Sequence, residues 1–166
     1  MSKTALEKLV ARFGAVITAQ HAQHGNETAS IQPASWVEVA TYCKDTLGFD
    51  MATDLTVVDY LGQEPRFEVV LHLYAVATKQ RLRLKTRPLA TEEVNDETPV
   101  LASLFSVWPA VNWLEREAWD LYGVKFEGHP DLRRILMYEE FVGHPLRKDY
   151  PKEKRQPLVR RPPAET

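Results

Sequence analysis

The hydrophobic positions at the start of the chain repeat at the spacing of an amphipathic helix. Apolar residues recur three and four positions apart, which predicts a helix that buries one face. These residues are Leu6, Leu9, Val10 and Phe13. Thr4 and Glu7 fit a capping box at the start of this helix, and Gly14 ends it.

A hairpin and a second helix are predicted next. Residues 15–32 indicate two short strands around a turn at Gly25 and Asn26. The helix begins at Pro33, a residue favoured at the first helical position, and ends at Gly48. Its apolar face comprises Trp36, Val39, Ala40, Cys43 and Leu47. Because Cys43 has no basic neighbour in the pattern, we interpret it as a small buried hydrophobe rather than a reactive thiol.

The hydrophobic period changes to two over residues 51–87, which predicts a three-stranded antiparallel meander. The alternating apolar positions are Leu55, Val57, Phe67, Val69, Leu71, Leu73, Leu82 and Leu84. In the last strand the intervening positions place four cations on one face, and these are Arg81, Arg83, Lys85 and Arg87. A solvated sheet face is the commoner explanation. A docking surface for an acidic partner is the alternative, because cations on one face repel each other unless something neutralises them.

Two further helices are predicted after an acidic loop that contains Glu92, Glu93, Asp96 and Glu97. Thr98 and Pro99 open a short helix through Leu101, Leu104 and Phe105, and a longer one runs from Pro109 to Tyr122 and ends at Gly123. The order of elements predicts an α+β fold, with an antiparallel or mixed β-sheet and helices packed on one of its faces.

The charge distribution separates the end of the chain from the rest. The 166 residues carry a net charge of -2, yet residues 147–166 contain seven Lys/Arg against three Asp/Glu. Five of the 11 prolines lie from Pro145 onward, where they discourage both helix and central strand. We therefore predict an α+β domain over residues 1–142 and an extended Pro-rich basic C-terminal arm over residues 143–166.

Composition excludes several classes of protein. The single cysteine, Cys43, permits no intrachain disulfide, and alone it cannot supply the thiolates of an iron–sulfur cluster or a structural zinc site. No stretch approaches the roughly 20 apolar residues of a membrane span. The start of the chain does not resemble a signal peptide, so we expect a soluble protein that stays where it is made.

The densest group of charged residues lies in the last predicted helix. Arg116 and Asp120 are four positions apart and could form an ion pair. Glu115 and Glu117 point about 200° apart around a helix, so they do not form a carboxylate pair that shares a proton.

Two Gly-His-Pro sequences follow that helix, at residues 128–130 and 143–145. Neither His129 nor His144 has a third metal ligand at a recognisable spacing, so we predict rigid bends whose imidazoles hydrogen-bond locally. The chain also lacks a phosphate loop, a nucleophile elbow and a dinucleotide fingerprint. We therefore expect no catalytic, cofactor-binding or metal site on this chain.

The segment from about 110 to 151 resembles, without a gap, the signature of the thirty-kilodalton (C) subunit of respiratory complex I, the proton-translocating NADH:quinone oxidoreductase. The residues that carry the resemblance are Glu115, Arg116, Glu117, Asp120, Gly128, His129, Pro130, Arg133, Ile135, Gly143, Pro145, Arg147, Lys148, Asp149 and Tyr150. In that family the protein scaffolds the quinone-reducing module of a complex that couples electron transfer from NADH to quinone with proton translocation.

The resemblance also implies partners and a location. The chain would contact the D (49 kDa-type), B and I subunits, while other subunits bind NADH, FMN, the Fe–S clusters and quinone. It would lie in the peripheral arm, on the cytoplasmic side of a bacterial inner (plasma) membrane or on the matrix side in mitochondria. Since the chain ends soon after the motif, we expect a short version of this subunit or a free-standing C subunit rather than a fusion of the C and D subunits.

Two other functions are compatible with some of these features. The same kind of chain could belong to a related membrane-bound hydrogenase or to a ferredoxin:plastoquinone oxidoreductase. An RNA-binding module is a remote alternative that would use the cations of residues 81–87 and the basic arm. It is disfavoured because Phe67 and Tyr74 fall on opposite faces of one strand, whereas a sheet that stacks bases presents its aromatic residues together.

Overall fold

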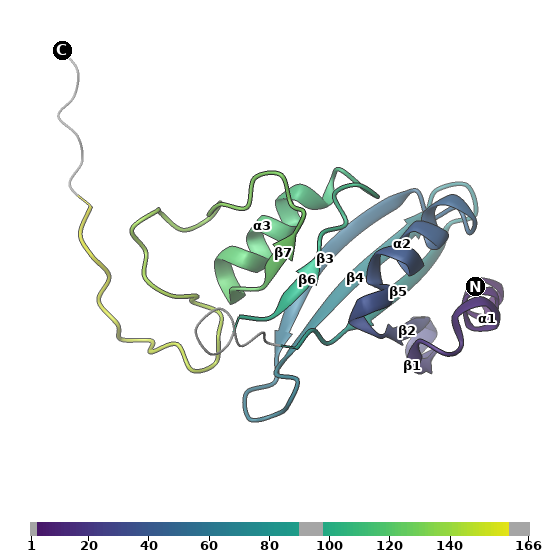
Figure 1. The fold of residues 1–166 in the computed structure, drawn as a ribbon, viewed down its shortest axis with the longest axis horizontal. Coiled ribbons are helices and arrows are strands. Elements are labelled where there is room, and N and C mark those ends of the chain that lie inside the picture. Colours follow the sequence, from purple (N-terminus) through teal and green to yellow (C-terminus); the bar gives the residue numbers. More distant parts are fainter. Residues whose placement is uncertain (1–2, 90–97, 160–166) are drawn as a thin grey trace, which may run out of the picture.

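A mixed five-stranded sheet with three helices forms the body of the protein (Figure 1). The structure is a computed structural model that describes residues 3–89 and 98–159. The helices are α1 (Lys3–Phe13), α2 (Trp36–Asp45) and α3 (Val111–Tyr122). The sheet has the order β1-β2-β5-β4-β3. Its strands are β1 (Ile17–His21), β2 (Thr28–Ile31), β3 (Met51–Asp59), β4 (Phe67–Ala75) and β5 (Gln80–Thr86).

The strand pairings confirm the predicted hairpin and meander. β1 pairs with β2, β3 with β4, and β4 with β5, all antiparallel. β2 then joins β5 in parallel, which makes the sheet mixed. The predicted α+β class is therefore confirmed.

The first two helices also form where they were predicted. The capping-box residue Thr4 is in the first turn of α1, but its side chain lies outside the described part of the structure. Pro33–Ser35 form a single 3₁₀ turn, so the regular helix α2 begins at Trp36 rather than at Pro33. Gly48 has a φ of 78°, a left-handed conformation that suits glycine and turns the chain toward β3.

The core lies between the helices and one face of the sheet. Alternate residues of the central strands, such as Leu71, Leu73 and Leu84, are buried there, together with Trp36 and Cys43 of α2. Burial raises the pKa of the Cys43 thiol to about 12. Cys43 is thus a buried hydrophobe, as predicted, and its thiol stays protonated.

The short helix predicted from Thr98 to Phe105 is wrong. Val100–Ala102 instead form strand β6, which pairs in parallel with β7 (Lys125–Glu127). The side chain of Leu101 is buried on this strand, as it would be on a helix. Pairing with β7 also provides hydrogen-bond partners for the backbone N–H and C=O groups of the strand. The helical spacing of the apolar residues was therefore overridden by pairing with β7, a strand that follows α3 in the sequence. The acidic residues Glu92, Glu93, Asp96 and Glu97 lie outside the described residues.

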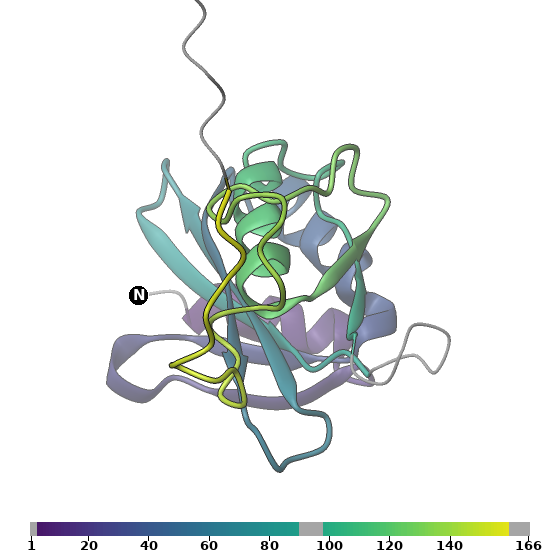
Figure 2. The same cartoon turned by 90° about the vertical axis from the view of Figure 1, so that its left-hand side faces the viewer.

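Residues 128–159 contain no helix or strand, and they run along α3 and past the loop that joins β3 and β4 (Figure 2). Backbone hydrogen bonds tie this segment to the body, including one from the Leu146 N–H to the Leu121 carbonyl. Across residues 3–89 and 98–159, no helix is long and apolar enough to cross a membrane.

Candidate functional site

Helix α3 brings together most of the charged residues that the sequence singled out. Glu115, Arg116 and Asp120 are buried on this helix, whereas Glu117 is exposed. Glu115 and Glu117 are therefore separated, as the helical spacing predicted. The helix ends at Gly123, whose φ is 79°. A Cβ at this position would lie 2.6 Å from the His144 ring, so only glycine allows residues 143–147 to pack here.

Asp120 holds the loop that follows the first Gly-His-Pro bend. Its carboxylate is fully buried and accepts the backbone N–H groups of Ile135, Leu136 and Met137 at 3.0, 2.8 and 2.8 Å. It also pairs with Arg134, whose Nη1 lies 2.5 Å from Asp120 Oδ1. Burial by itself would raise the pKa of Asp120, but these donors hold it below its ordinary value.

Arg116 holds the same loop from a neighbouring turn of α3. Its guanidinium donates from Nε to the Arg133 carbonyl at 3.1 Å and from Nη2 to the Arg134 carbonyl at 3.0 Å. The predicted Arg116–Asp120 ion pair is therefore wrong. The loop provides several N–H donors for Asp120 and two carbonyl acceptors for Arg116. Together these hydrogen bonds outnumber the single ion pair that the two side chains could form with each other. The Arg133 side chain itself is exposed and pairs with Asp131 at 2.9 Å.

Glu115 joins α3 to the segment after β6. It accepts the Ser103 hydroxyl at 2.6 Å and the Leu104 N–H at 2.7 Å. His129 Nε2 lies 4.0 Å from the same carboxylate, and both side chains are completely buried. Burial raises the pKa of Glu115 to about 7, against the opposing effect of its two hydrogen bonds.

We expect Glu115 to make stability depend on pH. Between pH 4.5, the ordinary pKa of this group, and about pH 7, Glu115 is protonated in the folded chain but ionised in the unfolded chain. The free energy of unfolding therefore falls as the pH rises through this window. Glu115→Gln should flatten that fall, as measured by urea unfolding followed through tryptophan fluorescence at several pH values. Glu117→Gln is the matched control and should keep the wild-type slope. An unchanged slope in Glu115→Gln would contradict the assignment.

Both Gly-His-Pro sequences form the predicted bends, but the prediction that both imidazoles hydrogen-bond locally is wrong for His144, whose partner Asp120 lies 24 positions away. Gly128 and Gly143 adopt φ values of 81° and 97°, which favour glycine. The Asp131 N–H donates to His129 Nδ1 at 3.0 Å, which leaves the neutral ring's proton on Nε2 for the Asn112 carbonyl at 3.2 Å. His144 Nδ1 donates to the Asp120 carbonyl at 2.9 Å, and burial lowers the pKa of His144. Pro130 is exposed and Pro145 partly buried where the chain leaves each bend.

The second bend leads to a contact with the loop between β3 and β4. Arg66 pairs with the buried Asp59 at 2.8 Å and with Asp149 at 2.6 Å, while the Lys148 N–H donates to Asp59 at 2.8 Å. A hydrogen bond from Arg66 is the main reason that the pKa values of Asp59 and Asp149 are lowered. This cluster fastens residues 148 and 149 to the sheet.

The neighbouring signature residues complete the attachment. Arg147 Nε donates to the Tyr122 carbonyl at the end of α3, at 2.6 Å. The Tyr150 ring stacks on Phe141, with 6.0 Å between ring centroids. The exposed signature side chains are those of Glu117, Pro130, Arg133, Lys148 and Asp149.

Sequence reasoning missed Asp59, Arg66 and Ser103. Asp59 and Arg66 lie 89 and 83 positions from their partners Lys148 and Asp149, and no spacing rule connects residues so far apart. The one available signal was the position of Asp59, which follows Leu55 and Val57 on the apolar face of its strand.

The buried charges of α3 serve to hold the chain's own backbone. Arg116 and Asp120 contact backbone groups of the following loop and fix the segment from Arg133 to Met137. Glu115 fixes the segment before the helix through Ser103 and Leu104. In the described ranges, no group of three or more His, Cys, Asp or Glu residues could hold a metal ion.

Comparisons with known proteins identify the family of this chain. The family model described as "Respiratory-chain NADH dehydrogenase, 30 Kd subunit" matches residues 29–156. The C subunit of the NADH-quinone oxidoreductase of Geobacter sulfurreducens is 46% identical over 148 residues, which cover 89% of this chain and 88% of that protein. Its counterpart in Paraburkholderia xenovorans is 44% identical over 157 residues, which cover 90% of this chain and 76% of that protein.

A solved structure shares the fold. A chain of the membrane-bound sulfane sulfur reductase, an archaeal respiratory membrane complex, superposes with a TM-score of 0.76 at 21% identity, over 92% of this chain and 86% of that chain. The family match includes α3, both Gly-His-Pro bends and the Arg66 cluster. The chain therefore belongs to the family of the 30-kDa (C) subunit of the respiratory-chain NADH dehydrogenase.

Proposed function

We propose that this chain is a structural subunit of the peripheral arm of a proton-translocating NADH:quinone oxidoreductase, where it scaffolds the quinone-reducing module. It carries no catalytic group and no cofactor in this proposal. NADH, FMN, the Fe–S clusters and quinone are bound by other subunits. Family membership supports the assignment, as do the names of the relatives, which are C subunits of NADH-quinone oxidoreductases.

One observation carries the scaffold role, namely the division of the family signature into buried and exposed side chains. The buried charges Glu115, Arg116 and Asp120 fix loops of this chain in place. The exposed charges Glu117 and Arg133 remain available on the surface that results. A rigid surface that presents fixed charges costs little ordering entropy when a neighbour binds, which is what a scaffold requires.

The partners in this proposal are other subunits of the complex, chiefly the D (49 kDa-type), B and I subunits. Contact with them would bring the chain to the cytoplasmic side of a bacterial inner membrane, or to the matrix side in mitochondria, as a peripheral protein. Residues 143–159 contain no helix or strand, so most of their backbone groups are free of regular structure and offer an interface to these subunits.

Affinity purification of the full-length tagged chain from a detergent extract tests this function. We expect NADH:ferricyanide reductase activity and cluster-bearing subunits to co-purify with the wild-type chain. Arg133→Ala should lower this recovery without changing the melting temperature of the isolated chain, because the side chain is exposed. Lys8→Ala is the matched control, since Lys8 is exposed and lies outside the matched residues 29–156.

The outcomes separate the possible functions. Recovery of the chain alone would contradict a scaffold role. Recovery with hydrogenase activity, or with a ferredoxin-dependent reductase, would assign it to a related complex instead. Recovery with RNA that nuclease treatment releases would indicate the RNA-binding alternative.

A further inference from the structure

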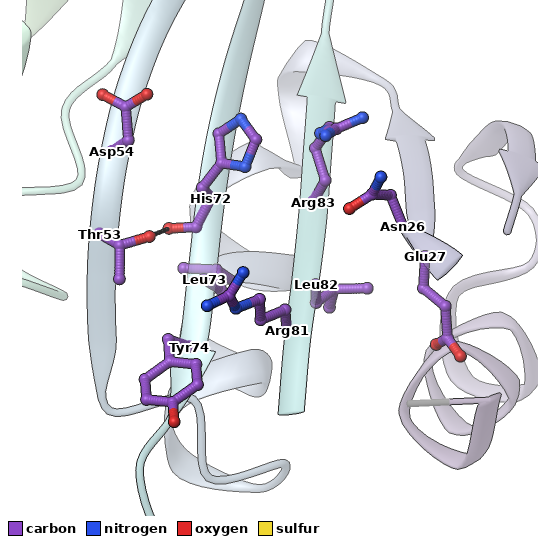
Figure 3. A pocket seen from close by; sticks show the side chains of 10 residues that line it. All are labelled: Asn26, Glu27, Thr53, Asp54, His72, Leu73, Tyr74, Arg81, Leu82 and Arg83. Atoms are coloured by element: carbon purple, nitrogen blue, oxygen red, sulfur yellow. Dashed lines mark hydrogen bonds between the residues drawn. The ribbon is translucent and has the colours of Figure 1, made fainter. Parts of the chain in front are cut away.

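The sheet face that the helices leave uncovered contains a hollow of about 500 Å³. Figure 3 shows that it extends from the residues that precede β2 across β5 and β4 to β3. Charged side chains of both signs surround it, and these are Glu27, Asp54, Arg81 and Arg83. Its lining includes His72 and Tyr74 of β4. This hollow is separate from the α3 site, which contributes no residue to it.

The four cations of residues 81–87 are not equally neutralised. Lys85 and Arg87 both pair with Glu68, at 2.8 and 3.3 Å. Arg81 lies over the Tyr74 ring, with its guanidinium carbon 5.8 Å from the ring centroid. Arg83 forms no ion pair with any residue in the described ranges, and its Nε is buried without a hydrogen-bond partner there. A solvated sheet face is therefore a sufficient explanation for Lys85 and Arg87, whose charges are neutralised by Glu68. It is a poorer explanation for Arg83, which has no ion pair in the described ranges.

A second polar atom beside Arg83 also lacks a partner. Glu27 is 5% exposed, and its Oε2 is buried without a hydrogen bond to any described residue. The two residues are neighbours, because the Arg83 N–H donates to the Glu27 carbonyl at 2.9 Å. Buried polar atoms without partners are rare, and each calls for an explanation. The Arg83 side chain lines the hollow and has no ion pair in the described ranges, so it fits a ligand that carries acceptor groups such as carboxylates.

We propose that this hollow docks an extended acidic segment of a neighbouring polypeptide, whose carboxylates bind Arg81 and Arg83. The inference rests on the proposed function, because it takes the partner from the complex in which the chain is a scaffold. A guanidinium binds a carboxylate through two parallel N–H donors, and such bonds are stronger than those between neutral groups.

Spacing along β5 supports an extended segment. Arg81 and Arg83 are alternate residues of one strand, so their Cα atoms lie about 7 Å apart on the same face. Acidic residues at alternate positions of an extended partner have the same spacing. Figure 3 shows both arginines on β5, with Asn26 and Glu27 beyond that strand and His72 and Tyr74 on β4.

The mixture of charges favours a protein over a polyanion. Asp54 and Glu27 border the hollow, and they would repel the continuous negative charge of RNA or of an anionic membrane. A segment with separate carboxylates can place them on the arginines and away from these two acids. The pKa of His72 is lowered by burial and by Arg83, so this ring is uncharged at neutral pH and the two arginines supply the positive charge of the hollow.

Charge reversal at Arg83 is the first test. Wild-type and Arg83→Glu full-length chains with different tags are expressed together, and the ratio of the two in the purified complex is measured. We expect Arg83→Glu to be at least about tenfold under-represented, as is typical when a close charge pair across an interface becomes repulsive. The isolated variant should keep the melting temperature of the wild type, because no described side-chain pairing depends on Arg83. Lys8→Glu makes the same change in net charge on an exposed residue of α1 and should assemble normally.

Equal incorporation of Arg83→Glu and wild type would overturn this inference while leaving the scaffold function intact, provided that the wild-type chain co-purifies with its neighbours. An equal loss in Lys8→Glu would also overturn it, since the effect would then follow net charge rather than the hollow.

Cross-linking identifies the occupant directly. Arg83→Lys keeps the positive charge and adds an amine that a water-soluble carbodiimide joins to a contacting carboxylate. In the detergent-solubilised complex, we expect mass spectrometry to find an amide between this lysine and an Asp or Glu of another polypeptide, and no such link from position 83 in the wild type. Links only to acids of the same chain, or wild-type retention of RNA that Arg83→Glu abolishes, would overturn the proposal.

Discussion

Replacement of Asp120 by asparagine is expected to lower the free energy of unfolding by about 3–5 kcal/mol, the usual cost of breaking a buried ion pair from one side. The substitution leaves Arg134 without its carboxylate and places an amide NH₂ or a neutral oxygen where three backbone N–H groups now converge. The loop from Ile135 to Met137 should then detach from α3. Urea unfolding followed by tryptophan fluorescence measures the loss.

Glu117→Gln provides the matched control for Asp120→Asn. It removes one carboxylate from the same helix, but Glu117 is exposed, so the free energy of unfolding should change by less than about 0.5 kcal/mol. Proteolysis adds a local measurement, because a detached loop should be cleaved between residues 133 and 143 under conditions in which the wild type stays intact. Equal stability of the two variants would show that Asp120 does not hold the loop.

The second large effect is expected at Arg66. Arg66→Met keeps much of the side-chain volume but leaves the Asp59 carboxylate, which is 4% exposed, without its cation. We expect a loss of about 3–5 kcal/mol in the free energy of unfolding. The segment around Asp149 should also separate from the sheet, since Arg66 binds both acids.

A double substitution tests this mechanism. In Asp59→Asn/Arg66→Met no charge remains buried, so this variant should recover part of the stability that Arg66→Met loses. Asp149→Asn is the second comparison, and it should cost much less because its side chain is 46% exposed. Additive losses in the double variant would contradict a direct interaction between Asp59 and Arg66.

Much of the fold could be predicted because its signals are local. The period-two strands from Leu55 to Leu84 and the helix that ends at Gly123 follow from neighbouring residues alone. β6 could not be predicted in this way, because Leu101 and Leu104 have helical spacing and the deciding partner, β7, lies beyond α3. The domain boundary predicted at residue 142 and the arm that follows it stay predictions.

The candidate site was predicted as a set of residues but not as a set of contacts. The resemblance identified Arg116 and Asp120, and their helical spacing suggested an ion pair between them. The structure gives each of them partners in the loop after His129. The spacing rule describes an isolated helix, and it fails where another segment covers the helix and supplies competing donors and acceptors.

The bond from the Lys148 N–H to Asp59 also has a consequence for biosynthesis, because it connects residues 89 positions apart. A chain leaves the ribosome with its N-terminal part first, so β3 and β4 can pair long before residue 148 has been made. The cluster around Arg66 closes only afterwards. A chain whose translation stops before residue 148 would contain the sheet and α3 but not this closure, so the closed cluster distinguishes a chain translated past Asp149 from one interrupted earlier.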